Sequence, residues 1–150
     1  MTRKLLLENV LSEDEIQDEI ASFARHLKNP FVMNLVAPMG CGKSTFVRTL
    51  LYHFGLKQNV PVTSPTFTLM NDYNIGDKWF AHLDLYRLTG QPDMEEWGLL
   101  DTRNFHGMFI EWPEIIGSSE YTKIKPTHEL HISYLDKDPD KREYKLFAVS

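Results

Sequence analysis

The sequence has a single cysteine, Cys41, and it lacks any apolar run long enough to cross a bilayer. One cysteine cannot form an internal disulfide, which excludes a small secreted fold stapled by disulfides. A membrane-spanning helix needs about 20 consecutive apolar residues, whereas the N-terminal run Leu5-Leu6-Leu7 stops at Glu8. That run is also too short for a signal peptide, and no small-residue cleavage site follows it. We therefore expect a cytoplasmic protein with no membrane partner.

The chain also lacks a basic patch. It contains 16 lysines and arginines against 21 aspartates and glutamates, a formal net charge of −5, and its basic residues are scattered in small groups such as Lys123 with Lys125. Proteins that bind nucleic acid unaided gain much of their affinity by neutralising phosphates. Any role near RNA is therefore expected to be indirect, through a partner protein.

Two long helices are predicted from capping signals and apolar periodicity. Ser12 and Glu15 have the spacing of a capping box, and the periodic apolar residues after them predict a helix that ends near Asn29-Pro30. A second helix is predicted to begin near Lys43. Gly55 is well placed to end that helix in the left-handed conformation.

The remaining segments predict strands and a single domain, residues 1–150, because no repeat, low-complexity tract or linker divides the chain. Helices alternate with strands early in the chain, and hairpins dominate late. This order predicts an α/β fold with a mixed parallel and antiparallel sheet, flanked by helices and ending in a C-terminal β-hairpin. The expected strands are residues 31–37, 67–73, 79–86, 108–112, 129–135 and 143–149, with a short helix at 93–97.

The segment between the first of these strands and the second helix reads Ala37-Pro38-Met39-Gly40-Cys41-Gly42-Lys43-Ser44-Thr45. A phosphate-binding loop needs glycines so that backbone N–H groups can curl around the oxygens. It also needs a lysine for the terminal phosphates and a neighbouring hydroxyl for Mg²⁺. The helix that follows directs the positive end of its dipole at the phosphates. We therefore predict a P-loop NTPase-like fold in which Met39 to Thr45 contact the nucleotide.

Two residues of this loop depart from the commonest pattern. Ala37 stands where the strict motif has glycine, at a hinge where the relaxed motif accepts alanine. Cys41 would lie at a helix start, where a thiolate is favoured. A small tolerated side chain is nevertheless a simpler interpretation of Cys41 than redox control.

Two acids are candidates to complete a hydrolytic site, since a phosphate loop hydrolyses poorly without carboxylates that hold Mg²⁺ and orient water. Met108-Phe109-Ile110-Glu111 is an apolar strand that runs into an acid, the form of a Walker B element. Strand alternation places Asp84 on the same face as His82. Either acid could instead be a solvated strand end or a structural ion pair. His82 lacks further clustered ligands and is interpreted as structural rather than metal-binding.

Taken together, these motifs resemble the TsaE family, the ATPase of the bacterial threonylcarbamoyladenosine system. The phosphate loop is followed in order by Ser64-Pro65-Thr66-Phe67-Thr68-Leu69, His82-Leu83-Asp84-Leu85-Tyr86-Arg87-Leu88 and Glu111-Trp112-Pro113. The likeness extends from the region of Ser12 to the final hairpin. Where the family usually has Gly-Asp-Leu-Gly, this chain has Ala37-Pro38-Met39-Gly40. Cys41 and Ser44 replace alanine and threonine, and no required chemical group is lost.

The resemblance implies a site for ATP and Mg²⁺. It implies that Ser44 and Glu111 hold the metal ion and that Asp84 supports hydrolysis. Thr66 would act as a switch residue near the γ-phosphate. These implications make Asp84, Glu111 and Thr66 the catalytic residues, and which of the two acids dominates stays open.

The resemblance also implies that Ser12 and Lys137 border the nucleotide, and it implies partners. These are the TsaD transferase and its companion TsaB, whose complex TsaE would reset between catalytic rounds by hydrolysing ATP. Contact with tRNA would then occur only indirectly, through that complex.

Two other functions fit parts of the sequence. A small P-loop kinase usually carries arginines in a lid, but only Arg87 and Arg103 lie between the loop helix and the C-terminal hairpin. A nucleotide-binding scaffold that does not hydrolyse ATP would have no need of Asp84 and Glu111. Phosphate release without a phosphorylated acceptor would argue against both alternatives.

Overall fold

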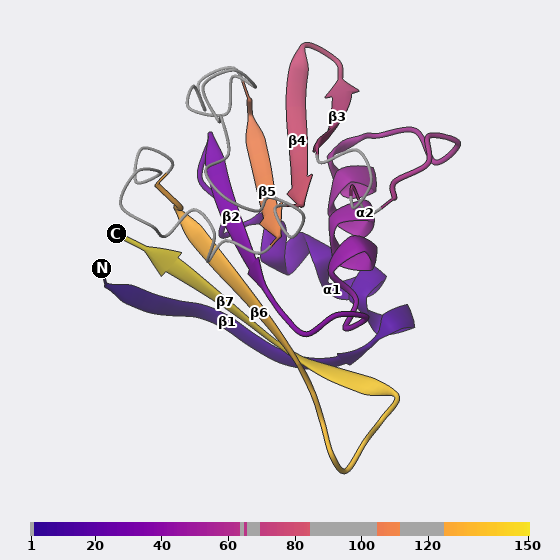
Figure 1. Cartoon of the computed structure of the whole chain (residues 1–150), viewed down its shortest axis with the longest axis vertical. Coiled ribbons are helices and arrows are strands. Elements are labelled where there is room, and N and C mark those ends of the chain that lie inside the picture. The colour runs from indigo at the N-terminus through magenta and orange to yellow at the C-terminus, as the bar shows by residue number, and fades with distance from the viewer. Residues whose placement is uncertain (1, 64, 66–69, 85–104, 112–124) are drawn as a thin grey trace, which may run out of the picture.

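The computed structural model describes residues 2–63, 65, 70–84, 105–111 and 125–150. In this part of the chain seven strands form one sheet, in the order β1-β7-β6-β2-β5-β4-β3 (Figure 1). Within the same residues two α-helices accompany the sheet. The elements are β1 (Arg3–Ser12), α1 (Glu13–Ala24), β2 (Phe31–Val36), α2 (Lys43–Phe54), β3 (Met70–Ile75), β4 (Lys78–Asp84), β5 (Gly107–Glu111), β6 (His128–Tyr134) and β7 (Lys141–Val149).

The sheet is mixed, as the sequence predicts. Its centre is parallel, because β2 pairs with both β5 and β6, and β4 pairs with β5. Its two sides are antiparallel, through β3 with β4 and through the C-terminal hairpin of β6 and β7, with β1 beyond it. The carboxyl ends of parallel strands meet at one edge of a sheet, where open α/β sheets bind their ligands. Here β2, β4 and β5 end at such an edge.

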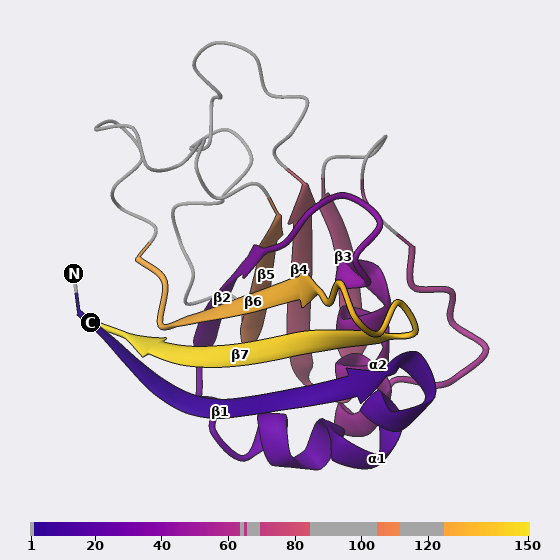
Figure 2. The same ribbon diagram turned by 90° about the horizontal axis from the view of Figure 1, so that it is seen from below.

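Both helices pack on the same face of the sheet (Figure 2). Ile16, Ile20 and Phe23 of α1 and the apolar side of α2 meet alternate residues of the strands in one buried cluster. The rings of Phe23 and Phe46 lie edge to face, 5.4 Å apart. Such aromatic contacts add about 0.5–1.5 kcal/mol to the burial of the rings. The packing fixes the start of α2, and hence the loop before it, against the sheet.

The central strands are buried on both faces. Met33 and Leu35 face the helices, while Val32, Met108 and Ile110 are equally inaccessible on the other side. Parallel strands typically read as continuous apolar runs for this reason. Asp84 and Glu111, the buried acids that end β4 and β5, therefore stand out from the apolar residues before them.

The first helix is shorter than predicted. The capping box forms, with Glu15 N donating to Ser12 Oγ and Ser12 N donating to the Glu15 carboxylate. The helix nevertheless ends at Ala24 rather than near Asn29-Pro30. Leu27 N donates to Ala24 O across three residues, so the chain tightens into a turn while Leu27 still packs against the core. The apolar spacing therefore continues to Leu27, beyond the end of the helix, and this is why the predicted helix is too long.

The strand β1 is absent from our sequence prediction. It pairs along its length with β7, and a bulge between Leu5 and Leu7 shifts its register. The bulge breaks the alternation that would reveal a strand, and half of the residues of this edge strand are exposed. The predicted helix at 93–97, the strand residues 67–69 and 85–86, and Trp112 lie outside the described residues.

Gly107 occupies a position where no side chain fits. It is the register partner of Phe31 on β2 and of Phe80 on β4. A Cβ at position 107 would overlap the ring of Phe31 and approach Phe80 Cδ1 to 2.9 Å. The two rings, 6.4 Å apart, therefore pack together over a glycine.

We expect Gly107→Ala to lower the free energy of unfolding by about 1–3 kcal/mol, the usual cost of overpacking a core. Chemical denaturation measures the change. If the ring of Phe31 is the cause, Phe31→Leu should cost less in the Gly107→Ala background than in the wild type, with a coupling of at least about 0.5 kcal/mol. Additive effects of the two substitutions would contradict this explanation.

Candidate active site at the phosphate loop

The residues between β2 and α2 form the predicted loop. Gly40 and Gly42 have φ angles of 78° and 106°, in the left-handed region that other residues rarely adopt. Open space surrounds the position of a Cβ at Gly42, so the backbone angle rather than crowding requires glycine there. Gly42 is the N-cap of α2, and its carbonyl accepts the first helical hydrogen bond, from Phe46 N. The loop thus bends directly into a helix N-terminus.

Lys43 is the first residue of α2, and its side chain is only 8% exposed. Its ammonium nitrogen lies 3.4 Å from the carbonyl oxygen of Ala37 and 3.5 Å from Glu111 Oε1. The lysine therefore lies under the loop and connects it to the end of β5. A buried ammonium keeps its charge only when anions or carbonyls surround it.

Glu111, the last residue of β5, is the buried anion that faces Lys43. Its Oε2 lies 2.7 Å from His82 Nε2 of β4. Burial opposes ionisation of this carboxyl, but the His82 hydrogen bond and the Lys43 charge outweigh it, so the pKa of Glu111 lies below its ordinary value. A carboxylate held ionised at the end of an apolar strand fits the Walker B interpretation.

His82 has the structural role that the sequence predicts. It is fully buried, and its Nε2 is bonded to Glu111. The described residues provide no hydrogen-bond partner for its Nδ1. They also contain no group of three or more histidines, cysteines or acids that could hold a metal ion among themselves.

Asp84 ends β4 directly beside Glu111. The two are register partners in the parallel pair of β4 and β5, and Leu35 of β2 is the next partner along. Adjacent strands lie about 4.8 Å apart, and Asp84 is 3% exposed. The structure therefore brings Lys43, Asp84 and Glu111 to one edge of the sheet. Thr66 lies outside the described residues.

The donors near this edge suit a magnesium ion. Mg²⁺ prefers hard oxygen ligands and is commonly held by one or two carboxylates together with phosphates. The hydroxyl of Ser44 stands in the first turn of α2, next to Lys43. The Ser44 hydroxyl and the Glu111 carboxylate are both oxygen donors of the kind that Mg²⁺ prefers.

A cavity of about 300 Å³ adjoins the loop on the side of Gly40, Cys41, Gly42 and Thr45. The start of α1 reaches this cavity, where Thr45 Oγ1 donates to Glu13 Oε1 over 3.3 Å. Burial raises the pKa of the Cys41 thiol, which opposes a thiolate there. The remaining lining residues come from β7 and from the hairpin turn that precedes it: Pro139, Asp140, Arg142 and Tyr144.

The hairpin contributes residues that sequence reasoning missed. Tyr134 OH donates to Met39 O over 3.3 Å, and the Arg142 guanidinium lies 4.4 Å above the Tyr134 ring. Tyr134 and Arg142 are register partners on β6 and β7. The segment from Glu129 to Tyr134 resembles the family, but sequence reasoning assigned neither Tyr134 nor Arg142 a role at the loop, because only the strand pairing brings them to it. Of the predicted bordering residues, Ser12 caps α1 beside Glu13, and Lys137 lies in the hairpin turn.

Comparison with known proteins identifies the family. The family model "Threonylcarbamoyl adenosine biosynthesis protein TsaE" matches residues 10–144. The chain belongs to the TsaE family. Its relatives include the TsaE proteins of Rickettsia felis and Aquifex aeolicus. The first is 31% identical over 130 residues, which cover 86% of this chain and 74% of that protein. The second is 36% identical over 115 residues, which cover 74% and 80%.

A solved structure supports the fold. The chain is similar to Bacillus subtilis YdiB, with a TM-score of 0.65 and 25% identity, over all of this chain and 89% of the other. The predicted fold class and the predicted family are both confirmed. TsaE proteins take part in threonylcarbamoyladenosine biosynthesis, a tRNA modification. The helices described here include none long and apolar enough to span a membrane.

The ion pair at Glu111 predicts a pH-dependent stability. Because its pKa is lower in the folded protein than the ordinary 4.5, ionised Glu111 contributes stability that is full above 4.5 and is lost as pH falls through the lower folded value. We expect Glu111→Gln to cost about 1–3 kcal/mol at neutral pH, a difference that shrinks in acid.

Denaturant unfolding at several pH values measures this difference. Glu8→Gln is the control, because Glu8 is exposed on β1 and its substitution removes the same single negative charge. A gap between wild type and Glu111→Gln that stays constant down to acid pH would contradict the assignment.

Proposed function

We propose that this chain is a Mg²⁺-dependent ATPase that acts in threonylcarbamoyladenosine synthesis. The observation that carries the proposal is the meeting of Lys43, Asp84 and Glu111 at the strand ends beside a glycine loop that opens into α2. A binding loop alone needs no buried carboxylates, whereas hydrolysis does. The neighbouring acids therefore favour an ATPase over a scaffold that only binds nucleotide.

Lys43 is well placed to exchange its contacts when nucleotide binds. Its distances to Ala37 O and Glu111 Oε1, 3.4 and 3.5 Å, are long for charge-assisted contacts. Phosphate oxygens carry more charge than a carbonyl and can replace these contacts at small cost. The backbone N–H groups at the start of α2 would complete the phosphate site.

Glu111 and Ser44 would hold Mg²⁺ in this proposal, and Asp84 would orient the attacking water. The ion, when bound, supplies positive charge that neutralises the phosphates. His82 fixes the Glu111 carboxylate through the 2.7 Å hydrogen bond and so sets its orientation. Thr66, if its hydroxyl contacts the γ-phosphate, would act as the switch that the family resemblance implies.

We expect Asp84→Asn and Glu111→Gln to lower the rate of ATP hydrolysis by about tenfold or more while changing ATP affinity much less, since both acids act mainly in the transition state. Single-turnover hydrolysis and calorimetric titration with ATP measure the two quantities. Lys43→Ala is the comparison variant, because it should remove ATP binding itself.

The two measurements also separate the candidate functions. Phosphate release without an added acceptor would exclude a kinase. Normal hydrolysis by Asp84→Asn or by Glu111→Gln would remove that acid from the mechanism. Unchanged ATP affinity in a folded Lys43→Ala variant would refute the whole nucleotide site.

We further propose that the partners are the TsaB and TsaD proteins, whose complex this chain resets by hydrolysing ATP. P-loop enzymes often depend on an arginine, in some cases from a partner, to stabilise transition-state charge. Among the described residues, Arg142 lines the cavity on the Thr45 side of the loop, a cavity that Lys43 does not line. Its Nη1 is already bonded to the carbonyls of Pro139 and Lys141. A partner protein could supply the positive charge that stabilises the transition state, or could order the residues around the nucleotide.

We expect the isolated chain to hydrolyse ATP slowly and the TsaB–TsaD pair to accelerate it, by roughly 10³-fold or more if charge is supplied. Phosphate release should be followed for the chain alone, with each protein, with both, and with tRNA alone. The net charge of −5 makes tRNA a poor direct activator. Stimulation by tRNA but not by the protein pair would contradict the proposal.

A further inference from the structure

A second cavity adjoins the phosphate loop, and it shares no lining residue with the first. It has a volume of about 270 Å³. It lies between the end of β2 and β6, the neighbouring strand, and Lys43 is among its lining residues. Its lining residues are Leu35, Val36, Ala37, Pro38, Lys43, His131, Ile132 and Ser133.

The polar groups of this cavity suit an anion. Lys43 brings a positive charge, and His131 and Ser133, two residues apart on β6, bring an imidazole and a hydroxyl. No carboxylate is found among the described residues that line it, whereas Glu13 and Asp140 line the first cavity. A water molecule occupies about 30 Å³. The cavity therefore has room for a small oxyanion and several waters.

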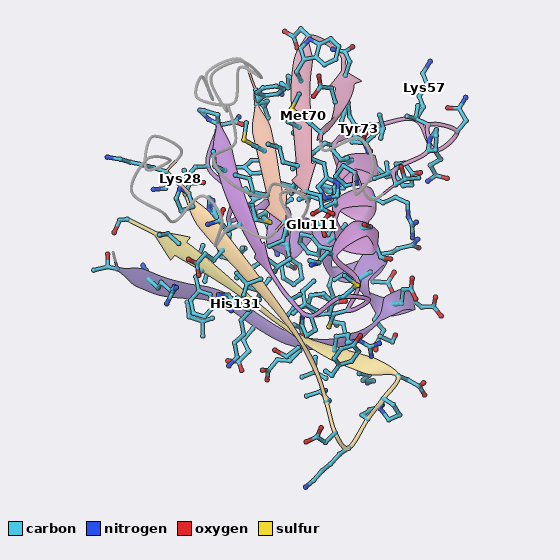
Figure 3. The ribbon with its side chains drawn as sticks, viewed as in Figure 1. Lys28, Lys57, Met70, Tyr73, Glu111 and His131 are labelled. Carbon is cyan, nitrogen blue, oxygen red and sulfur yellow. The ribbon has the colours of Figure 1, made fainter. Side chains whose placement is uncertain are left out.

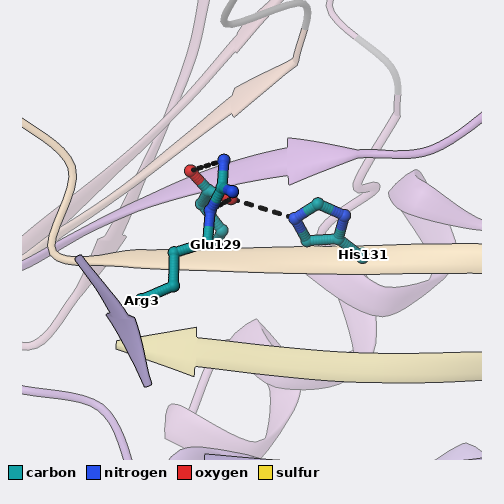
Figure 4. Close-up of polar contacts among 3 residues, drawn as sticks. All are labelled: Arg3, Glu129 and His131. Atoms are coloured by element: carbon teal, nitrogen blue, oxygen red, sulfur yellow. Dashed lines mark hydrogen bonds and ion pairs between the residues drawn. The ribbon is translucent and has the colours of Figure 1, made fainter. Parts of the chain in front are cut away.

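His131 is held in a fixed orientation. Its Nε2 lies 2.9 Å from Oε1 of Glu129, whose side chain is 7% exposed. Arg3, reaching from β1, places its Nε 2.8 Å from the same oxygen (Figure 4). The ring of Phe147 packs edge-on against the imidazole at 5.1 Å. Burial opposes ionisation of Glu129, but the His131 and Arg3 hydrogen bonds outweigh it and keep its pKa below the ordinary value.

This arrangement determines which ring nitrogen of His131 can meet a ligand. With Nε2 engaged by Glu129, the Nδ1 atom stands on the other side of the ring (Figure 4). Nδ1 is therefore the ring nitrogen left to meet a ligand in the cavity that His131 and Lys43 both line. Figure 3 shows His131 on β6 and Glu111 on β5, the two strands that flank β2. The Arg3–Glu129 ion pair is explained by a structural role, because it joins β1 to β6. That role does not require His131 to line a cavity, as it does.

We propose that this second cavity is an anion site for a tetrahedral oxyanion, inorganic phosphate, with Lys43, His131 and Ser133 as its donors. Free phosphate from solution and phosphate released from bound ATP have the same chemistry. Occupation by released phosphate rests on the proposed ATPase function. Occupation by free phosphate does not.

The test is a titration of the full chain with inorganic phosphate at constant ionic strength, followed by NMR of the histidine rings. His131→Gln assigns the His131 signals among the six histidines. We expect these signals to move saturably both without nucleotide and with ADP saturating the phosphate loop. Ser133→Ala should weaken phosphate binding about fivefold, the effect of one hydrogen bond. Glu129→Gln should weaken it too, because the ring loses its orienting partner.

Lys145→Ala is the matched control. Lys145 is the register partner of His131 on β7, a partly exposed cation that does not line the cavity. Its loss should change phosphate affinity less than about twofold. The site would be overturned if the His131 signals did not move saturably with phosphate. It would also be overturned if Lys145→Ala lost as much phosphate affinity as Ser133→Ala.

In a last experiment, ATP and Mg²⁺ are added to the chain without inorganic phosphate, and the His131 signals are followed. The same His131 shift should develop as ATP is consumed, which supports released phosphate as an occupant. A shift with added phosphate but none during ATP consumption would overturn that source. If ADP and ATP do not bind while free phosphate still moves His131, the proposed ATPase function fails and the anion site stands.

Discussion

The buried carboxylate of Glu111 is the interaction on which the rest of this site depends. It joins β5 to β4 through His82 and to the start of α2 through Lys43. A buried charge is tolerated only when it is paired, and removing one partner leaves the others uncompensated. The same contacts that stabilise the central sheet therefore also hold the lysine under the loop. In the proposed function, stability and nucleotide chemistry are therefore coupled at Glu111.

The C-terminal hairpin gives the loop its surroundings on two sides. Tyr134 holds the backbone at Met39 and stacks under Arg142, while His131, three residues earlier on β6, borders the other cavity. The two cavities differ in charge, since acids line only one of them among the described residues. A nucleotide carries both neutral and anionic parts, and the loop lies where these two environments meet. One hairpin therefore shapes both sides of the loop.

Local patterns were sufficient to predict much of this structure. The capping box at Ser12, the glycine turn into α2 and the apolar strand ending at Glu111 each depend on neighbouring residues, and all three are present. The same reasoning extended α1 too far, because apolar spacing continues through a turn that still packs on the core. It missed β1, because a bulge interrupts the alternation along that edge strand.

The sequence by itself determined the loop, its lysine and the two acids, because their chemistry is encoded in adjacent residues and in their order along the chain. Only the tertiary structure decided that Glu111 pairs with both Lys43 and His82, and that Arg142 and His131 stand beside the loop. These contacts join residues from separate strands and helices. They follow from sheet order and register, which depend on how the whole core packs and not on any local pattern.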